Sequence, residues 1–347
     1  MLVLLLFPPL LEAREVRHVK EVDAFIEHMV RAHGFDKVAL DALFAKVQRC
    51  EPAIRLVSPA PSSAPPMDWQ VYRSRFVNRV RIMGGVEYWK KHRQTLSRAS
   101  RQFAVPPEII VAIIGVETLY GRHTGSYRVL DALSTLAFDY PDAPNRKDRM
   151  AFFRGELENA LVFSRRSGID PLSLYGSYAG AIGLPQFMPG SILKYGIDFD
   201  GDGRIDLMHS APDAIGSVAN FLSMHGWRKG EPVVLAASVR SDGWKSLPGG
   251  LSARFSLKKL EASGVFPAEN APGLSFGLID LQNGNRPSEY WLGTDNFFAI
   301  TQYNRSYYYA MSVVDLSQAL KKALQKGLTS SNTSGSCLVS RNCGNND

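Results

Sequence analysis

The stretch over residues 105–121 reads Val-Pro-Pro-Glu-Ile-Ile-Val-Ala-Ile-Ile-Gly-Val-Glu-Thr-Leu-Tyr-Gly. From residue 109 onward it is apolar on nearly all sides, which predicts a helix buried in the core. Pro106 and Pro107 suit the first turn of that helix, where a backbone N–H has no partner within the helix. Glu117 is the only charged residue between residues 109 and 121. The sequence therefore places one carboxyl group at the end of a buried helix.

Glu117 is the candidate catalytic residue. Loss of solvent penalises a carboxylate and raises its pKa toward neutrality. A carboxylic acid that is still protonated near neutral pH can donate its proton to a glycosidic oxygen. A structural role stays open, in which the acid pairs with Arg122 or His123 or accepts a hydrogen bond from the backbone.

A second informative stretch, residues 176–191, is dense in glycine, proline and small residues. Glycine lets a backbone approach a ligand closely. Ser177 and Gln186 offer a hydroxyl and an amide that suit sugar hydroxyls and N-acetyl groups. Apolar faces for sugar rings come from Tyr178, Phe187 and Met188. The alternative is an ordinary loop with a tight turn and core aromatic residues.

Taken together, these segments resemble the lytic transglycosylase B family, bacterial enzymes that cleave murein. The matching motifs follow the family's order from the first helix to about residue 325: 105–110, 113–118, 130–136, 186–189, 214–220, 225–227, 303–304 and 309–311. The resemblance implies a mainly α (α+β) fold. It would have a lysozyme-like helical core, an additional helical domain and a small β-rich subdomain.

The resemblance also implies a reaction and a site. Glu117 would be the sole acid/base in cleaving the β-1,4 bond between N-acetylmuramic acid and N-acetylglucosamine, with a 1,6-anhydromuramoyl product. The substrate-binding residues would be Tyr72, Ser177, Gln186, Phe221, Tyr303, Asn304 and Tyr309. Phe221 stands where the family has a tyrosine, so a ring remains but a hydroxyl hydrogen bond is lost.

The sequence favours a mechanism with one acid, because no second carboxylate stands in an apolar setting like that of Glu117. Ordinary glycosidases use two, separated by about 5–5.5 Å or 6.5–9.5 Å. Asp131 is better explained as a helix cap or a first-turn acid, and Asp139 and Asp142 lie in a turn-like segment. Two alternatives remain: a hydrolytic muramidase of the same fold, and a catalytically silent, calcium-dependent module that binds the cell wall.

A calcium loop is predicted over residues 198–206. Its oxygen ligands stand at positions one, three, five, seven (a backbone carbonyl) and nine of an EF-hand pattern: Asp198, Asp200, Asp202, Arg204 and Asp206. His209 occupies position twelve, where an EF-hand has glutamate. The resemblance implies that Asp213 closes the loop, which is one residue longer than the family pattern. The alternative is a polar turn that binds nothing, and the His/Cys spacing does not favour zinc.

The net charge suits an anionic partner but does not choose one, and a mildly basic solvated surface is the alternative. The chain has 347 residues and a net charge of +7, which suits an anionic partner. The cell wall, with its stem-peptide carboxylates, is one such partner. No zinc-finger or RNP signature indicates nucleic acid. The apolar start, residues 1–11, resembles the core of a secretory signal, and no lipoprotein cysteine follows it. We expect a soluble, monomeric periplasmic enzyme.

The three cysteines are Cys50, Cys337 and Cys343. The last two lie in a Ser/Asn-rich tail and could form a short disulfide in an oxidising compartment, which would leave Cys50 over.

The expected organisation has six parts: a residual signal-like segment (1–14), an N-terminal helical domain (15–100), a catalytic core with the calcium loop (101–230), a β-rich subdomain (231–302), a C-terminal helix packing back on the helical domain (303–327) and a disordered tail (328–347). Helices are expected at about 19–33, 36–47, 86–103, 145–167, 212–225, 257–263 and 310–326. Short strands are expected at 233–235, 276–279, 290–292 and 297–300. A Pro/Ser/Ala linker is expected at 58–66.

Overall fold

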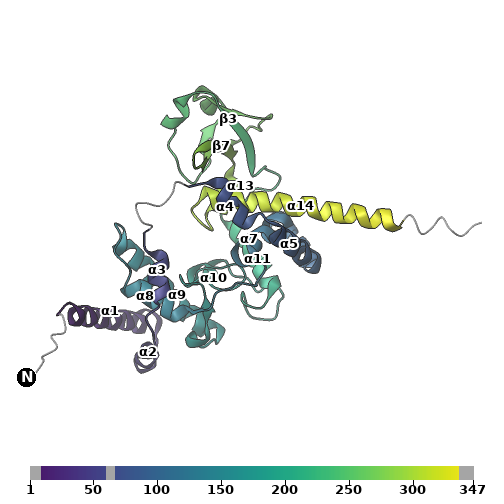
Figure 1. Ribbon diagram of the computed structural model, residues 1–347. Helices are drawn as coiled ribbons and strands as arrows, with labels where there is room; N and C mark the ends of the chain where they lie inside the picture. The colour runs from purple at the N-terminus through teal and green to yellow at the C-terminus, as the bar shows by residue number, and fades with distance from the viewer. Residues whose placement is uncertain (1–8, 60–66, 336–347) are drawn as a thin grey trace, which may run out of the picture. The chain divides into compact units, whose positions relative to one another are not determined.

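The computed structural model describes residues 9–59 and 67–335 (Figure 1). The chain folds as two compact units, each made of two separate stretches. Of the described residues, unit 1 holds 9–59 and 124–196, and unit 2 holds 67–123 and 197–335. The chain therefore passes from one unit to the other between residues 59 and 67, after residue 123 and after residue 196.

Unit 1 is helical, with one two-stranded antiparallel ribbon, β1 and β2. Helix α8 packs against α9, and α9 packs against α10. Its elements are α1 (Pro9–His33), α2 (Lys37–Phe44), α3 (Glu51–Val57), β1 (Tyr127–Arg128), α8 (Val129–Phe138), α9 (Arg146–Ser167), η1 (Pro171–Ser173), β2 (Tyr175–Gly176) and α10 (Pro189–Tyr195).

Local signals explain where the first helices of unit 1 begin and end. Gly34 has φ +64°, a left-handed conformation that suits glycine and ends α1 at the predicted place. Asp36 caps α2 as predicted, because its carboxylate accepts a hydrogen bond of 2.7 Å from the backbone N–H of Ala39.

Unit 2 holds the buried helix that the sequence predicts. Helix α7 begins at Pro107 and ends at Thr118, and Ile110, Ile113 and Ile114 are fully buried. It packs against α5, α6, α11 and α14. The helices of unit 2 are α4 (Trp69–Phe76), α5 (Arg79–Lys91), α6 (Arg93–Phe103), α7, α11 (Ala211–Met224), η2 (Asp242–Ser246), α12 (Leu257–Ala262), α13 (Asp295–Thr301) and α14 (Tyr307–Gly335).

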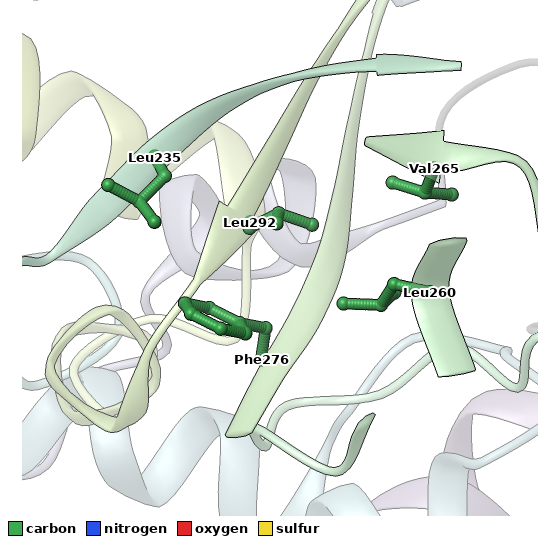
Figure 2. Packing of buried hydrophobic residues seen from close by; sticks show 5 residues of the cluster. All are labelled: Leu235, Leu260, Val265, Phe276 and Leu292. Atoms are coloured by element: carbon green, nitrogen blue, oxygen red, sulfur yellow. The ribbon is translucent and has the colours of Figure 1, made fainter. Parts of the chain in front are cut away.

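The remaining part of unit 2 is a five-stranded antiparallel sheet with the strand order β4-β6-β7-β3-β5. Its strands are β3 (Val234–Val239), β4 (Phe255–Ser256), β5 (Val265–Pro267), β6 (Ser275–Asn283) and β7 (Arg286–Gly293). Figure 2 shows its small core of Leu235, Leu260, Val265, Phe276 and Leu292. The mainly helical fold class with a small β-rich part is confirmed.

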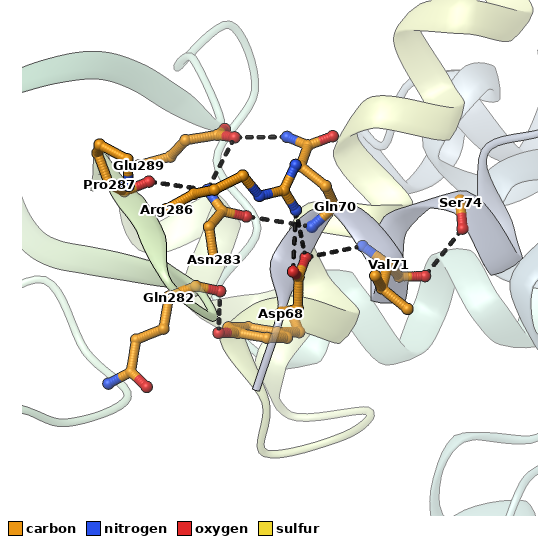
Figure 3. A network of polar contacts seen from close by, with 10 residues as sticks. Asp68, Gln70, Val71, Ser74, Gln282, Asn283, Arg286, Pro287 and Glu289 are labelled. Atoms are coloured by element: carbon orange, nitrogen blue, oxygen red, sulfur yellow. Dashed lines mark hydrogen bonds and ion pairs between the residues drawn. The ribbon is translucent and has the colours of Figure 1, made fainter. Parts of the chain in front are cut away.

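A polar network joins the segment that opens α4 to the β6–β7 hairpin (Figure 3). Both carboxylate oxygens of Asp68 accept from Arg286, at 2.8 and 2.9 Å. The Gln70 amide donates to Glu289 at 2.5 Å, and its backbone N–H donates to Asn283 at 3.2 Å. These bonds anchor the start of α4, which carries the predicted site residue Tyr72.

Three predicted elements are wrong in type or extent. Residues 297–300 form part of helix α13, because Thr294 caps a helix there with a 3.2 Å bond from the backbone N–H of Asn296. A short apolar run does not distinguish a buried strand from a buried helix. The helix expected at 86–103 begins earlier, at Arg79, and is interrupted at His92. The last helix passes through Gly327 and ends at Gly335, since a helix tolerates a single glycine.

The predictions for the cysteines and for the linker concern residues that lie partly outside the described ranges. The buried Cys50 is a free thiol, whereas Cys337 and Cys343 lie outside the described residues, as does most of the predicted linker.

Within the described part of the chain, no single helix is long and apolar enough to cross a membrane. The pair α6 and α7, bent by 113°, passes the same test of length and composition only when taken together.

Candidate active site

Glu117 lies in the last turn of α7, just before two residues with a left-handed backbone conformation. Leu119 and Tyr120 follow it with φ values of +52° and +62°. The N–H groups of these two residues donate to the carbonyls of Gly115 and Ile114, which closes the helix. Such conformations are uncommon for non-glycine residues, and backbone strain of this kind clusters at functional sites.

Tyr120 holds this end of α7 from the side. Its hydroxyl donates to the carbonyl of Arg81 at 2.8 Å, and the Arg81 guanidinium donates to the carbonyl of Gly115 at 3.1 Å. The ring passes so close to Gly85 and Gly115 that a Cβ at Gly115 would lie 2.5 Å from the Tyr120 hydroxyl. The sequence analysis did not predict roles for Tyr120 and Arg81. The one sequence feature that could have indicated Tyr120 is a glycine, Gly115, close to a large aromatic residue in the same helix end.

The carboxyl group of Glu117 accepts a hydrogen bond from a phenol. The Tyr309 hydroxyl, from α14, donates to its Oε1 at 2.5 Å. Burial raises the pKa of Glu117 to about 7, and the hydrogen bond from Tyr309 opposes that rise. The side chain nonetheless retains partial access to solvent. Glu117 is thus an acid that holds its proton near neutral pH and can still be reached.

The structural alternative for Glu117 does not match its contacts. Among the ion pairs of the described residues, none joins Glu117 to Arg122 or His123. Its partner is the neutral phenol of Tyr309, whose own pKa is raised well above its usual value by burial and by the Glu117 charge.

Aromatic rings surround the acid. Tyr303 stacks on Tyr309 with ring centroids 6.4 Å apart and an interplanar angle of 19°. Phe221 contacts Tyr303 at 4.7 Å between centroids. After burial, the charge of Glu117 is the next cause that raises the pKa values of Tyr72 and Tyr303. The fold therefore places four predicted site residues, from α4, α11, the turn between α13 and α14, and α14 itself, in one aromatic group that includes the partner of the acid.

Asn304 differs from its neighbours. Its residue is exposed, and its backbone carbonyl accepts a 2.6 Å hydrogen bond from the N–H of Ser306. It therefore shapes the turn between α13 and α14.

Tyr72 also lines an open pocket of about 550 Å³ in unit 2. The pocket mixes apolar and charged groups: Met67, Asp68, Val71, Tyr72, Arg75, Gly284, Asn285 and Tyr308. Glu117 is not among the residues that line this pocket, so the pocket does not enclose the acid.

Ser177 and Gln186 belong to unit 1, where they shape the glycine-rich loop. The Ser177 hydroxyl accepts hydrogen bonds from the N–H groups of Ala179 and Ala181, at 3.3 and 3.0 Å. Gln186 has φ +50°, and its amide donates to the carbonyls of Thr124 and Gly183. Both side chains are half-buried. A left-handed glutamine in a glycine-rich loop is a second strained position among the predicted site residues.

The candidate second acids in unit 1 are either paired with an arginine or exposed to solvent. Arg128 donates to both oxygens of Asp131, which lies in the first turn of α8 as predicted. Arg49 donates to Asp139 at 2.7 Å. Asp142 is fully exposed.

The sequence did not single out Glu156, a half-buried acid. Burial raises the pKa of Glu156 on α9, and its carboxylate accepts a 2.8 Å bond from the N–H of Gly190. Its helix has mixed polar and apolar residues, so the sequence gives no sign that this position is enclosed. The bond ties Glu156 to the first turn of α10, which is a structural role.

The predicted calcium loop brings three carboxylates together. One oxygen from each of Asp198, Asp200 and Asp202 lies within 4.8 Å of the others. Backbone N–H groups of the loop point at the same side chains, with Gly201 and Gly203 donating to Asp198 at 2.7 and 2.8 Å. Oxygen-rich loops of this kind suit Ca²⁺.

Asp206 and Asp213 stabilise the loop by accepting hydrogen bonds from its backbone N–H groups. Asp213 is buried, and its oxygens accept from the N–H groups of Phe199 at 2.7 Å and Asp206 at 2.8 Å. Asp206 accepts from the N–H groups of Met208 and His209. The backbone N–H of Arg204, in turn, donates to Asp202 at 2.9 Å.

Comparison with known proteins decides the family. The model of the transglycosylase SLT domain matches residues 18–318. The chain belongs to the transglycosylase SLT domain family. Over 309 residues, 86% of this chain and 82% of the relative, it is 42% identical to the membrane-bound lytic murein transglycosylase B of Escherichia coli K12.

Solved structures show the same fold. The soluble lytic transglycosylase SltB1 from Pseudomonas aeruginosa matches with a TM-score of 0.78 and 44% identity, over 87% of this chain and 99% of that one. The Escherichia coli lytic transglycosylase Slt35, solved in complex with calcium, matches with 0.77 and 40%, over 87% and 93%. SltB3 from Pseudomonas aeruginosa, in complex with NAG-anhNAM-pentapeptide, matches with 0.72 and 29%, over 88% and 79%. The lysozyme-like fold and the lytic transglycosylase activity expected from the sequence are confirmed.

Proposed function

We propose that Glu117 is the single acid/base of a peptidoglycan lytic transglycosylase. The observation that supports this role is its pKa of about 7 in an aromatic surrounding, with Tyr309 donating to Oε1. At neutral pH such a group is present both as an acid and as a base. The substrate class follows from the family and from the related structure that holds a peptidoglycan fragment.

In the first step, the protonated Glu117 donates its proton to the glycosidic oxygen between N-acetylmuramic acid and N-acetylglucosamine. The bond between that oxygen and the anomeric carbon breaks, and the N-acetyl group assists at the anomeric carbon. The hydroxyl of Tyr309 donates to the carboxylate that remains on Glu117, which stabilises the charge at this stage.

In the second step, the Glu117 carboxylate takes the proton of the substrate's own C6 hydroxyl. The C6 oxygen bonds to the anomeric carbon and closes the 1,6-anhydro ring, so Glu117 is protonated again and no water is consumed. An intramolecular nucleophile has a large effective molarity, which favours this route. The reaction is that of a carbon–oxygen lyase.

The substrate would be held by aromatic faces and by polar groups. In unit 2, Tyr72, Phe221, Tyr303 and Tyr309 would offer rings and Asn304 an amide. In unit 1, Ser177 and Gln186 would offer a hydroxyl and an amide. The rings already packed around Glu117 support the first set, and the strained backbone of Gln186 supports the second.

Calcium fits the loop of unit 2. Asp198, Asp200 and Asp202 would hold the ion with side-chain oxygens, together with the Arg204 carbonyl and Asp206 in the EF-hand pattern. Asp213, beyond the twelve-residue pattern, would close the loop as the family resemblance implies. The clustering of the first three acids within 4.8 Å and the related structure in complex with calcium support this assignment. The ion would neutralise acids that otherwise repel one another, which is a structural function.

The setting that suits this activity is the periplasm, where murein lies, and the enzyme would act there as a monomer. The name of the Escherichia coli relative, a membrane-bound murein transglycosylase, supports a location at the cell envelope.

The deciding experiment is mass spectrometry of purified murein digested with wild type and with Glu117→Gln. Wild type should release 1,6-anhydromuramoyl ends, and Glu117→Gln should lose cleavage by at least about 10²-fold while it still sediments with murein. Reducing muramic acid ends would favour the hydrolytic muramidase. Unchanged lysis by the variant would refute the role of Glu117.

A further inference from the structure

A second candidate metal centre lies in unit 1, away from the acidic loop along the chain. The imidazoles of His28 and His33, both from α1, face the carboxylate of Glu158 on α9. His28 Nε2 lies 3.2 Å from one oxygen of Glu158, and His33 Nε2 lies 2.6 Å from the other. The three ligand atoms lie within 4.8 Å of one another.

We propose that His28, His33 and Glu158 form a binding site for a late first-row divalent cation, with Zn²⁺ as the ion that fits best. Imidazole nitrogen and carboxylate oxygen are ligands that Zn²⁺ prefers, and a set of two histidines and one glutamate is a known donor set for it. This donor set does not suit Ca²⁺, which takes oxygen ligands.

The distances are close to those that a bound ion requires. Ligand bonds of about 2.0–2.2 Å in tetrahedral geometry separate the ligand atoms by roughly 3.3–3.5 Å. The His28–Glu158 distance of 3.2 Å lies just below this range, and the His33–Glu158 distance of 2.6 Å must widen by less than about 1 Å. A change of rotamer in the half-buried His33 or Glu158 side chain is sufficient for that change.

Solvent access also permits binding. A neutral imidazole with its proton on Nδ1 offers the lone pair of Nε2 to a metal ion. The side chains of His33 and Glu158 are 28% and 29% exposed, and that of His28 is 47% exposed. This exposure leaves room for water in the remaining coordination position.

The backbone on one side of the centre is anchored. The Arg165 guanidinium donates to the carbonyl of His33 at 2.8 Å and lies 4.0 Å from the centroid of the Phe35 ring. An ion would therefore join the end of α1 to the middle of α9 at a place where α1 is already attached to the same helix. The histidines are five positions apart and Glu158 is distant in sequence, which is why sequence spacing did not indicate zinc.

The test is titration of the full-length chain with Co²⁺ and with Zn²⁺, in saturating Ca²⁺ so that the acidic loop is filled. We expect one Co²⁺ per chain with the intense visible absorption of four-coordinate cobalt, and displacement of that signal by Zn²⁺. His28→Ala and His33→Ala should each weaken Zn²⁺ binding at least about ten-fold in calorimetry. His92→Ala, which removes a histidine of unit 2, should leave the affinity unchanged.

Glu158→Gln keeps polar atoms beside both histidines and removes only the anionic ligand, so it is the variant that best separates metal binding from folding. It should lose affinity while its circular dichroism and its lysis of murein stay at wild-type level. The proposal is overturned if wild type shows no saturable Co²⁺ or Zn²⁺ binding below about 1 mM. Equal affinity in His28→Ala, His33→Ala and Glu158→Gln would overturn it as well.

Discussion

Among single residues, Glu117 has a pKa that links activity to stability. Its folded-state pKa of about 7 lies above the ordinary value of 4.5 because burial disfavours the charged form. Between these two values the unfolded chain loses its proton while the folded chain keeps it. The contribution of Glu117 to stability therefore falls as pH rises from about 4.5 to about 7.

Glu117→Gln should for this reason be more stable than wild type above pH 7. The raised pKa corresponds to about 3 kcal/mol at most, and the partial exposure of the side chain makes about 2 kcal/mol the expected gain. The gain should vanish below pH 4.5, the ordinary value. Urea unfolding of both proteins at pH 4 and pH 8 measures it, and an equal difference at both pH values would contradict the assigned pKa.

Tyr309 should set the orientation and the pKa of the acid. Its hydrogen bond lowers the pKa of Glu117, so Tyr309→Phe should raise that pKa and shift the alkaline limb of the pH–rate profile above its wild-type position near pH 7. Loss of a hydrogen bond to a charged group should slow cleavage about ten-fold.

The matched control for Tyr309→Phe is Tyr307→Phe, two positions earlier on α14. The Tyr307 hydroxyl donates to the carbonyl of Gly250 and does not contact Glu117. The alkaline limb of Tyr307→Phe should coincide with that of wild type. If both variants shift it equally, the effect comes from α14 as a whole and not from the contact with the acid.

Among the helices, the end of α7 depends on two glycines that make room for Tyr120. A Cβ on Gly115 would lie 2.5 Å from the hydroxyl oxygen of Tyr120 and 2.6 and 2.8 Å from two of its ring carbons. Gly115→Ala should therefore displace Tyr120 and destabilise the protein by about 1–3 kcal/mol. Because Tyr120 and Arg81 position the last turn of α7, cleavage should fall as well.

Gly155→Ala provides the control for Gly115→Ala. Gly155 is also a glycine inside a helix, α9, but a Cβ there would meet nothing within 4 Å. The substitution should stabilise the protein by up to about 1 kcal/mol, since alanine is the better helix former. Thermal and urea unfolding of the two variants compare them directly, and a loss of stability in both would show that packing at Tyr120 is not the cause.

The acidic loop before α11 should respond to calcium. An ion that binds only the folded chain raises its stability by about 2.7 kcal/mol when present at 100 times its dissociation constant. The melting temperature of wild type should therefore rise when Ca²⁺ is added and fall again when a chelator removes the ion. Asp202→Asn, at an exposed loop position, should reduce the response.

Asp242→Asn should leave the calcium response unchanged, because Asp242 is an exposed acid paired with Lys245 outside the loop. If Asp202→Asn responds to calcium as strongly as wild type does, the ion is held elsewhere.

For the whole molecule, the net charge of +7 should contribute to binding of murein through its carboxylates. Attraction between exposed charges is screened over about 8–10 Å at physiological salt. Sedimentation of Glu117→Gln with purified murein should therefore decrease as NaCl rises from 0.05 to about 0.5 M. Amidation of the stem-peptide carboxylates should remove most of this salt dependence. Binding that does not depend on salt would assign the affinity to the aromatic site alone.

The sequence predicted the parts of the molecule that depend on local signals. The proline start and apolar run of α7, the Asp36 cap and Gly34 at the end of α1 were all readable from neighbouring residues. It failed where tertiary contacts decide. Residues 297–300 form a helix, and the place of Tyr309 against Glu117 depends on a helix that lies 192 positions away.

Family resemblance named the aromatic residues that the structure places near Glu117, but it did not give their geometry. The half-buried Glu156 and the support from Tyr120 and Arg81 needed the structure. The histidine–glutamate centre of unit 1 is likewise a product of helix packing and has no signature in residue spacing.

The contact between α7 and α14 has a consequence for how the enzyme comes into being. A ribosome makes the chain from its N-terminus, so Glu117 leaves the exit tunnel long before Tyr309 does. Until α14 arrives, the acid has neither its phenol partner nor the neighbouring ring of Tyr303. A nascent chain, or one terminated before Tyr309, would thus carry an incomplete site.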